Sequence, residues 1–164
     1  ELIFVIVILG ILASVAIPRL AGTREDAEIS TAIANLRTLL SDASSYRAAK
    51  GNLNGTKWKD FTNVPLKNAD RPAAVGGKDN DGILKVGDQD CILVALRDRT
   101  VTATGTVVPA YIVFAKKTGG GDVCTQVQNA APVQAYFDSR VENLDLGNGT
   151  NKGAIAIGSS TTIY

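Results

Sequence analysis

An almost continuous apolar run at the start of the chain limits what it can fold into. Fourteen of residues 1–17 are apolar, and only Glu1, Gly10 and Ser14 are not. As an α-helix the run would span about 26 Å, slightly less than the ~30 Å hydrocarbon core of a bilayer. The rest of the 164-residue chain has an ordinary mixture of apolar and charged residues. We therefore expect an apolar stem attached to a globular body.

A signal-peptide core or a plain transmembrane anchor is the simpler explanation of such a run. A signal peptide begins with basic residues and ends at a small-residue cleavage site. This run instead opens on Glu1 and continues into Ile17-Pro18-Arg19. Glu1 is the unusual residue, because acidic side chains inside membranes are costly and are usually paired or functional. Its simpler role is a favourable charge at a helix N-terminus.

The arrangement of Glu1, Gly10 and Pro18 resembles the N-terminal stem of type IV pilins and type II secretion pseudopilins. The resemblance is strong over residues 1–25 and extends more weakly to residue 50. It implies an α+β, pilin-like fold, in which a long N-terminal helix packs on a C-terminal antiparallel β-sheet. The chain contains no Met. We therefore expect residues upstream of Glu1, where mature family members begin with an N-methylated aromatic residue.

The resemblance also implies a structural function. A prepilin peptidase would remove a basic leader and methylate the new N-terminus, while the stem holds the subunit in the inner membrane. Identical subunits would then bundle their stems into an extracellular pilus that supports adhesion, motility or uptake. Glu1 would pair with the N-terminus of a neighbouring subunit, because an unpaired buried carboxylate is expensive. The residues expected to carry assembly are Glu1, Phe4, Gly10 and Pro18.

Two other functions stay open. One is a pseudopilin that acts in the periplasm as part of a type II secretion system. The other is a membrane-anchored binding or enzymatic domain that never polymerises. No enzyme is expected, because the chain has no His, the commonest general base. Nearly balanced charges, 17 Lys and Arg against 16 Asp and Glu, argue against a nucleic-acid binder held by bulk charge.

The stem helix should be weakest between Gly10 and Pro18. Proline removes one backbone hydrogen bond and clashes with the carbonyl of the preceding turn, and glycine costs about 1 kcal/mol relative to alanine. We expect the helix to be bent or partly unwound there, with a kink in the single subunit and unwinding in a filament.

The second half of the stem should be an amphipathic helix. Apolar residues recur at steps of three and four from Ile29 to Tyr46, and Gly51 ends the pattern. This gives a stem of residues 1–51, with residues 1–18 as its membrane or filament-core part, and a body of residues 52–164.

The body should be rich in β-strands. The best strand candidates are Cys91–Arg97, Ala110–Lys116 and Ala154–Ile157; Val123–Gln128 and Val133–Phe137 are weaker. Cys91 and Cys124 lie on or beside these candidates, and in an exported chain we expect them to form a disulfide. Two buried free thiols are the alternative.

Other sequence features give weaker indications. Asp79, Asp81, Asp88 and Asp90 form an acidic, glycine-punctuated stretch, but its spacing lacks the closing Glu of an EF-hand. Calcium binding is therefore a weak possibility beside a solvated turn, and no other cofactor is expected. Ser159 and Ser160 in the C-terminal tail are weak candidates for O-linked glycosylation. Trp58, between two lysines, either contacts a polyanion or anchors the connection between helix and sheet.

Overall fold

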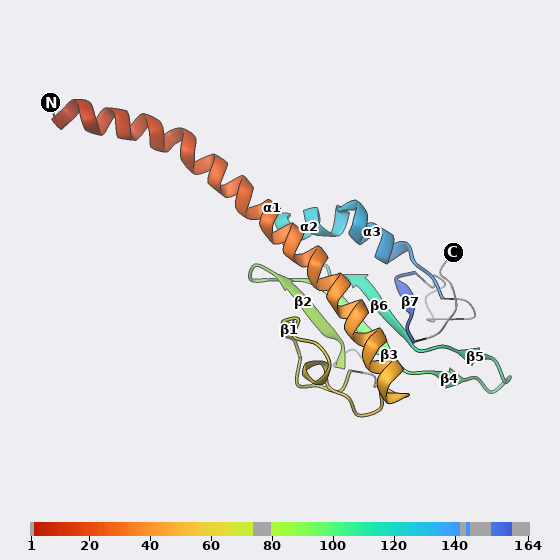
Figure 1. Ribbon diagram of the computed structural model, residues 1–164. Helices are drawn as coiled ribbons and strands as arrows, with labels where there is room; N and C mark the ends of the chain where they lie inside the picture. Colours follow the sequence, from red (N-terminus) through yellow and green to blue (C-terminus); the bar gives the residue numbers. More distant parts are fainter. Residues whose placement is uncertain (1, 74–79, 142–143, 145–151, 159–164) are drawn as a thin grey trace.

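The computed structural model combines one long helix with an antiparallel sheet (Figure 1). It describes residues 2–73, 80–141, 144 and 152–158, with the backbone alone for residues 16–21. The long helix α1 is N-terminal and the sheet belongs to the C-terminal part of the chain. The predicted α+β class is therefore confirmed at this level.

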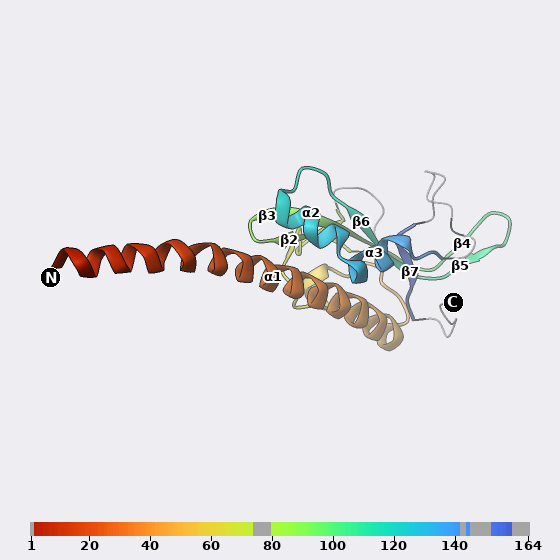
Figure 2. The same cartoon turned by 90° about the horizontal axis from the view of Figure 1, so that it is seen from above.

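Helix α1 runs without interruption from Leu2 to Lys50. It curves between the projecting stem and the body (Figures 1 and 2), and it remains helical through Gly10 and Pro18. Partial unwinding of this stretch, one of the two expected forms, is thus not seen in the single subunit. A bend without a break can separate a proline ring from the preceding turn at the cost of one hydrogen bond. Unwinding within a filament stays a prediction.

The C-terminal end of α1 is fixed by Gly51. This residue has a φ of +76°, a left-handed conformation that glycine adopts without strain. Its N–H donates a hydrogen bond to the carbonyl of Arg47 at 2.9 Å, which satisfies one of the free carbonyls of the last turn.

The second half of α1 buries one apolar face against the sheet. The residues of this face that are fully buried recur at helical spacing: Ala32, Leu36, Leu39 and Ala43. Side chains from the facing strands complete the core, among them Val94 of one central strand and Phe114 of the next. This packing attaches the stem to the body along about half of its length.

The sheet has five antiparallel strands in the order β1-β2-β3-β6-β7. Their bounds are Leu66–Lys67 for β1, Gly82–Val86 for β2, Gln89–Arg97 for β3, Tyr111–Lys116 for β6 and Ala154–Ala156 for β7. Strands β4 (Thr100–Val101) and β5 (Val107–Val108) form a separate two-stranded ribbon. A short 3-10 helix, η1 (Trp58–Asp60), precedes β1.

The two weaker strand candidates are wrong, because both segments are helices. Helix α2 spans Asp122–Asn129 and α3 spans Ala131–Asp138. In α2 the buried residues are Cys124 and Val127, and in α3 they are Val133 and Phe137. These spacings of three and four place each pair on one helical face, whereas a strand alternates every second residue.

Cys91 of β3 and Cys124 of α2 form a disulfide with a Cα–Cα distance of 5.4 Å. Both residues are buried in the main core. The bridge therefore joins a central strand to a helix, not two neighbouring strands. It holds α2 beside both the sheet and α1, with which α2 is also in contact.

Candidate assembly surface on the stem

The first turns of α1 expose a dense apolar surface. The large hydrophobic side chains of this part are between 41% and 78% accessible: Leu2, Ile3, Phe4, Val5, Ile6, Val7, Ile8, Leu9, Ile11, Leu12 and Val15. Both views show this part of the helix projecting away from the body (Figures 1 and 2). We call Leu2–Val15 the stem surface. Soluble monomers rarely expose continuous apolar areas of this kind, and such areas usually mark contacts with a protein or a membrane.

The stem surface is apolar on all sides of the helix. The one hydroxyl within it, Ser14, donates its hydrogen to the carbonyl of Ile11 at 2.7 Å, so this polar group is satisfied inside the helix. A helix that is apolar all round is normally buried, either inside a protein assembly or in a membrane. Sequence and structure thus agree on a helix surface of the kind that is normally buried.

Of the four residues expected to carry assembly, the structure describes Phe4 and Gly10 fully. Phe4 is 70% accessible, and Gly10 has open space around the position where a side chain would begin. The side chain of Pro18 and the whole of Glu1 lie outside the described residues. Among helices whose side chains are described, none is both long and apolar enough to cross a bilayer.

The three candidate calcium ligands that the structure describes, Asp81, Asp88 and Asp90, do not converge on one point. Asp81 precedes β2, while Asp88 and Asp90 follow it, so a strand of about 17 Å, at ~3.3 Å per residue, separates them. Asp81 pairs with Arg97 at 3.3 Å, and Asp90 pairs with Lys67 at 2.9 Å. The described part of the chain contains no group of three acidic or other ligating side chains that could hold a metal. Asp79 lies outside the described residues, as do the glycosylation candidates Ser159 and Ser160.

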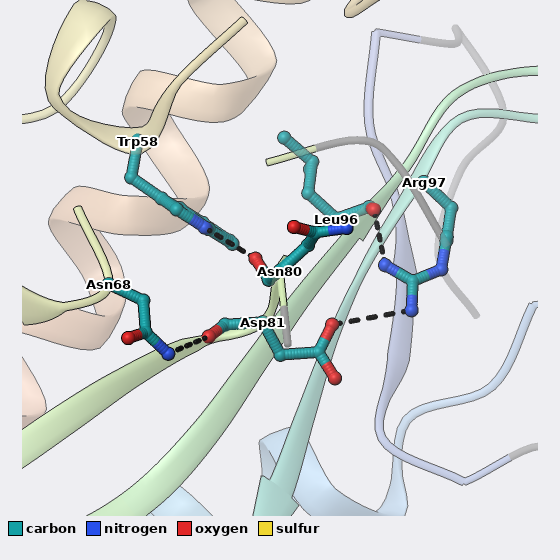
Figure 3. A network of polar contacts seen from close by, with 6 residues as sticks. All are labelled: Trp58, Asn68, Asn80, Asp81, Leu96 and Arg97. Atoms are coloured by element: carbon teal, nitrogen blue, oxygen red, sulfur yellow. Dashed lines mark hydrogen bonds and ion pairs between the residues drawn. The ribbon is translucent and has the colours of Figure 1, made fainter. Parts of the chain in front are cut away.

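Asp81 belongs instead to a polar network beside the start of β2 (Figure 3). Its side chain is only 8% accessible and faces the guanidinium of Arg97, which also donates to the carbonyl of Leu96 at 2.7 Å. The amide of Asn68 donates to the backbone carbonyl of Asp81 at 3.2 Å. These contacts fix where β2 enters the sheet.

Trp58 is fully buried and completes this network. Its indole N–H donates to the backbone carbonyl of Asn80 at 3.1 Å, and its ring lies 5.7 Å from that of Phe61. The residue therefore anchors the connection between helix and sheet and is not available to a polyanion.

Among the described residues of the body, three titratable groups have shifted pKa values. Burial raises the pKa of the Tyr111 phenol, because the phenolate would lose its hydration; the nearby positive charge of Arg97 opposes this shift only in part. On the surface, a hydrogen bond and ion pair between Lys59 and Asp70 raises the pKa of the lysine and lowers that of the carboxyl. None of these groups lies on the stem.

Two surface features were missed by sequence reasoning. One is a hollow between α1 and the β2–β3 turn, and the other is an exposed valine pair on the β4–β5 ribbon. Neither has a sequence signature, because the hollow depends on the packing of distant segments and the ribbon strands are only two residues long.

No protein-family model, curated protein or solved structure matches this chain.

Proposed function

We propose that this chain is a structural subunit of an extracellular type IV pilus, which polymerises by bundling its stem helices. The single observation that carries the proposal is the stem surface, an exposed helical rod apolar on every side and joined to a folded body. Bundling of many copies would bury the apolar surface of this rod. The pilus would support adhesion, motility or uptake.

Bundling of the stems is energetically plausible. Full burial of a large apolar side chain contributes about 1.5–3 kcal/mol relative to water, so free stems in water would associate strongly. A subunit held in the inner membrane before assembly avoids that exposure. Transfer from lipid to a filament core of similar polarity then costs little, and packing between helices provides the attraction.

Glu1 has a specific role in this proposal. Its carboxylate would enter the filament core, where an unpaired charge costs several kcal/mol. A pair with the N-terminus of the neighbouring subunit removes that cost only at one axial offset between stems. The contact would therefore set the register of the polymer.

The test is electron microscopy of material sheared from producing cells, with the Glu1→Ala variant beside the unaltered chain. We expect filaments of this chain, with stems inside and residues 52–164 outside, and no filaments from Glu1→Ala. Asp26→Ala is the matched control, because Asp26 is an exposed carboxylate on the same helix. It should assemble normally.

Filaments that are absent, or that are built from another chain, would contradict the pilus and favour the periplasmic pseudopilin or an anchored domain that never polymerises. Normal filaments from Glu1→Ala would leave the pilus intact and overturn the register role of Glu1.

A further inference from the structure

A small hollow lies at the stem side of the body, between α1 and the turn that joins β2 to β3. Its volume is about 210 Å³. Four of its nine lining residues are small or apolar, namely Ala27 and Ala32 of α1 and Val86 and Gly87 of the facing segment. The other five, Thr31 and Asn35 among them, are polar or charged. Gly87 has a φ of +57°, so the turn favours a residue without a side chain, and the Glu28 carboxylate of α1 lies 3.2 Å from the position where a side chain would begin.

The β4–β5 ribbon carries an apolar pair with no partner in the described structure. Val101 and Val107 are directly opposite each other in the register, so both side chains leave the same face of the ribbon. They are 58% and 46% accessible. Val108 is buried among the residues of a second, smaller core, so the ribbon is attached to the body there. A two-stranded ribbon is only marginally stable by itself, so a further contact would stabilise it.

The hollow and the valine pair lie at opposite ends of the body. In both views the β2–β3 turn faces the projecting stem, and the β4–β5 ribbon extends beyond the other end (Figures 1 and 2). The ribbon therefore does not reach the hollow of its own chain. A contact between two different patches on identical copies does not close on itself unless its rotation forms a ring, and it otherwise produces an open helical polymer.

The charges beside the two features are complementary. Arg99 is exposed next to the ribbon, and Asp88 is exposed next to the hollow. Neither side chain has an ion-pair partner among the described residues. Arg24 and Glu28 at the rim already pair with each other at 3.1 Å. The remaining rim cation, Lys85, can lay its aliphatic part along an apolar neighbour while its ammonium stays in water.

We propose that the β4–β5 ribbon of one copy docks into the hollow of the next copy. Val101 and Val107 enter the space between α1 and the β2–β3 turn, and Arg99 faces Asp88. The inference rests on the proposed function, because bundled stems hold the bodies side by side. It adds a head-to-tail contact between the bodies. Contacts of both the stem and the body would then set the spacing between successive subunits of the filament.

Disulfide trapping in sheared filaments tests this contact. The full-length double variant Val107→Cys with Ala27→Cys should form covalent trimers and larger species on a non-reducing gel, because each copy would link to the next. The control, Val107→Cys with Thr38→Cys, places the second cysteine on an exposed part of α1 outside the hollow. It should give several-fold less of these species. The native disulfide is buried and intramolecular, so it does not contribute bands.

The possible outcomes separate the two proposals. A ladder is the series of covalent trimers and larger species on the gel. Filaments in which both variants give equal ladders, or none, would overturn the docking contact and leave the pilus intact. Ladders without filaments in the unaltered chain would support the contact and contradict the pilus. No filaments and no ladders from any chain would overturn both.

If the cysteine variants do not assemble, a charge-reversal series tests the docking contact instead. Arg99→Asp and Asp88→Arg should each lower the filament yield several-fold, and the double reversal should restore it. Equal yields from all chains, or a double variant no better than the single ones, would overturn the docking contact.

Discussion

At the scale of single residues, the pair of Asp81 and Arg97 shows how a candidate ligand becomes a structural group. An acidic residue beside glycine is typical of a solvated turn, and the sequence predicts Asp81 either in such a turn or, more weakly, as a calcium ligand. The structure buries its carboxylate against a guanidinium that is itself only 26% accessible. The partner is 16 residues away in the chain, on the adjacent strand, so the pairing depends on strand register and could not be predicted locally.

Loss of Arg97 should destabilise the body. In Arg97→Ala the carboxylate of Asp81 stays buried without its charged partner, and we expect the free energy of unfolding to fall by about 1.5–3 kcal/mol. Urea unfolding measures this through the fluorescence of Trp58, the only tryptophan. Arg99→Ala, at an exposed site, is the matched control and should change stability by less than about 0.5 kcal/mol. Equal effects of the two variants would contradict a specific role for the pair.

Tyr111 should make stability depend on alkaline pH. Burial raises the pKa of its phenol in the folded state above the usual value of about 10, so the folded state holds this proton more tightly than the unfolded state. The resulting stability is fully present below pH ~10 and is lost as the pH rises through the folded-state pKa.

The measurement compares urea midpoints of the unaltered chain and Tyr111→Phe from pH 8 to pH 12. Above pH ~10 the unaltered chain should lose more stability than the phenylalanine variant, since only the former has a phenol to ionise at this position. Parallel curves for the two chains would show that the pKa of the Tyr111 phenol is the same in the folded and the unfolded state.

At the scale of elements, the reliability of sequence reasoning follows from the length and regularity of each pattern. The amphipathic half of α1 repeats its apolar spacing over several turns, and both β3 and β6 have continuous runs of strand-forming residues. These elements, and the short β7, occur where the sequence predicted them. Helices α2 and α3 have eight residues each, and each contains only one pair of buried residues. One pair is too few to distinguish a helical from a strand period in the sequence. Strand β2 was not predicted from the sequence, because its five residues begin with a glycine and include a charged lysine.

The disulfide should account for much of the attachment of α2. It closes a loop with a sequence separation of 33, for which chain-entropy reasoning gives about 3–4 kcal/mol. The Cys91→Ala and Cys124→Ala double variant should lose about this much in urea unfolding. A thiol reductant should produce a similar loss in the unaltered chain and none in the variant. Hydrogen bonds from Gln128 to the carbonyls of Cys91 and Lys117, at 2.7 and 3.0 Å, should keep α2 helical in the folded variant.

At the scale of the whole molecule, the projecting half and the packed half of α1 differ in their energetics although they form one helix. Among the side chains of α1 that the structure describes, those that belong to the main core begin at Ile29, and the buried ones all lie in the second half of the helix. The stem surface contributes nothing to this core in the described structure. Folding of the body and assembly of the stem should therefore be separable by truncation.

A chain that starts at Thr23 should fold but not polymerise. Its free energy of unfolding should stay within about 1 kcal/mol of that of the full chain, because none of the described side chains among the removed residues belongs to the core. Urea unfolding through Trp58 and analytical ultracentrifugation measure the two properties on one sample, and we expect a stable monomer. The docking contact between bodies joins two-residue strands to a hollow of about 210 Å³, so we do not expect it to hold copies together alone, since specific interfaces usually bury more than ~1,000 Å². Filaments from the truncated chain would show that the body, not the stem, drives assembly. An unfolded truncated chain would show that the stem stabilises the body through contacts beyond those of the single subunit.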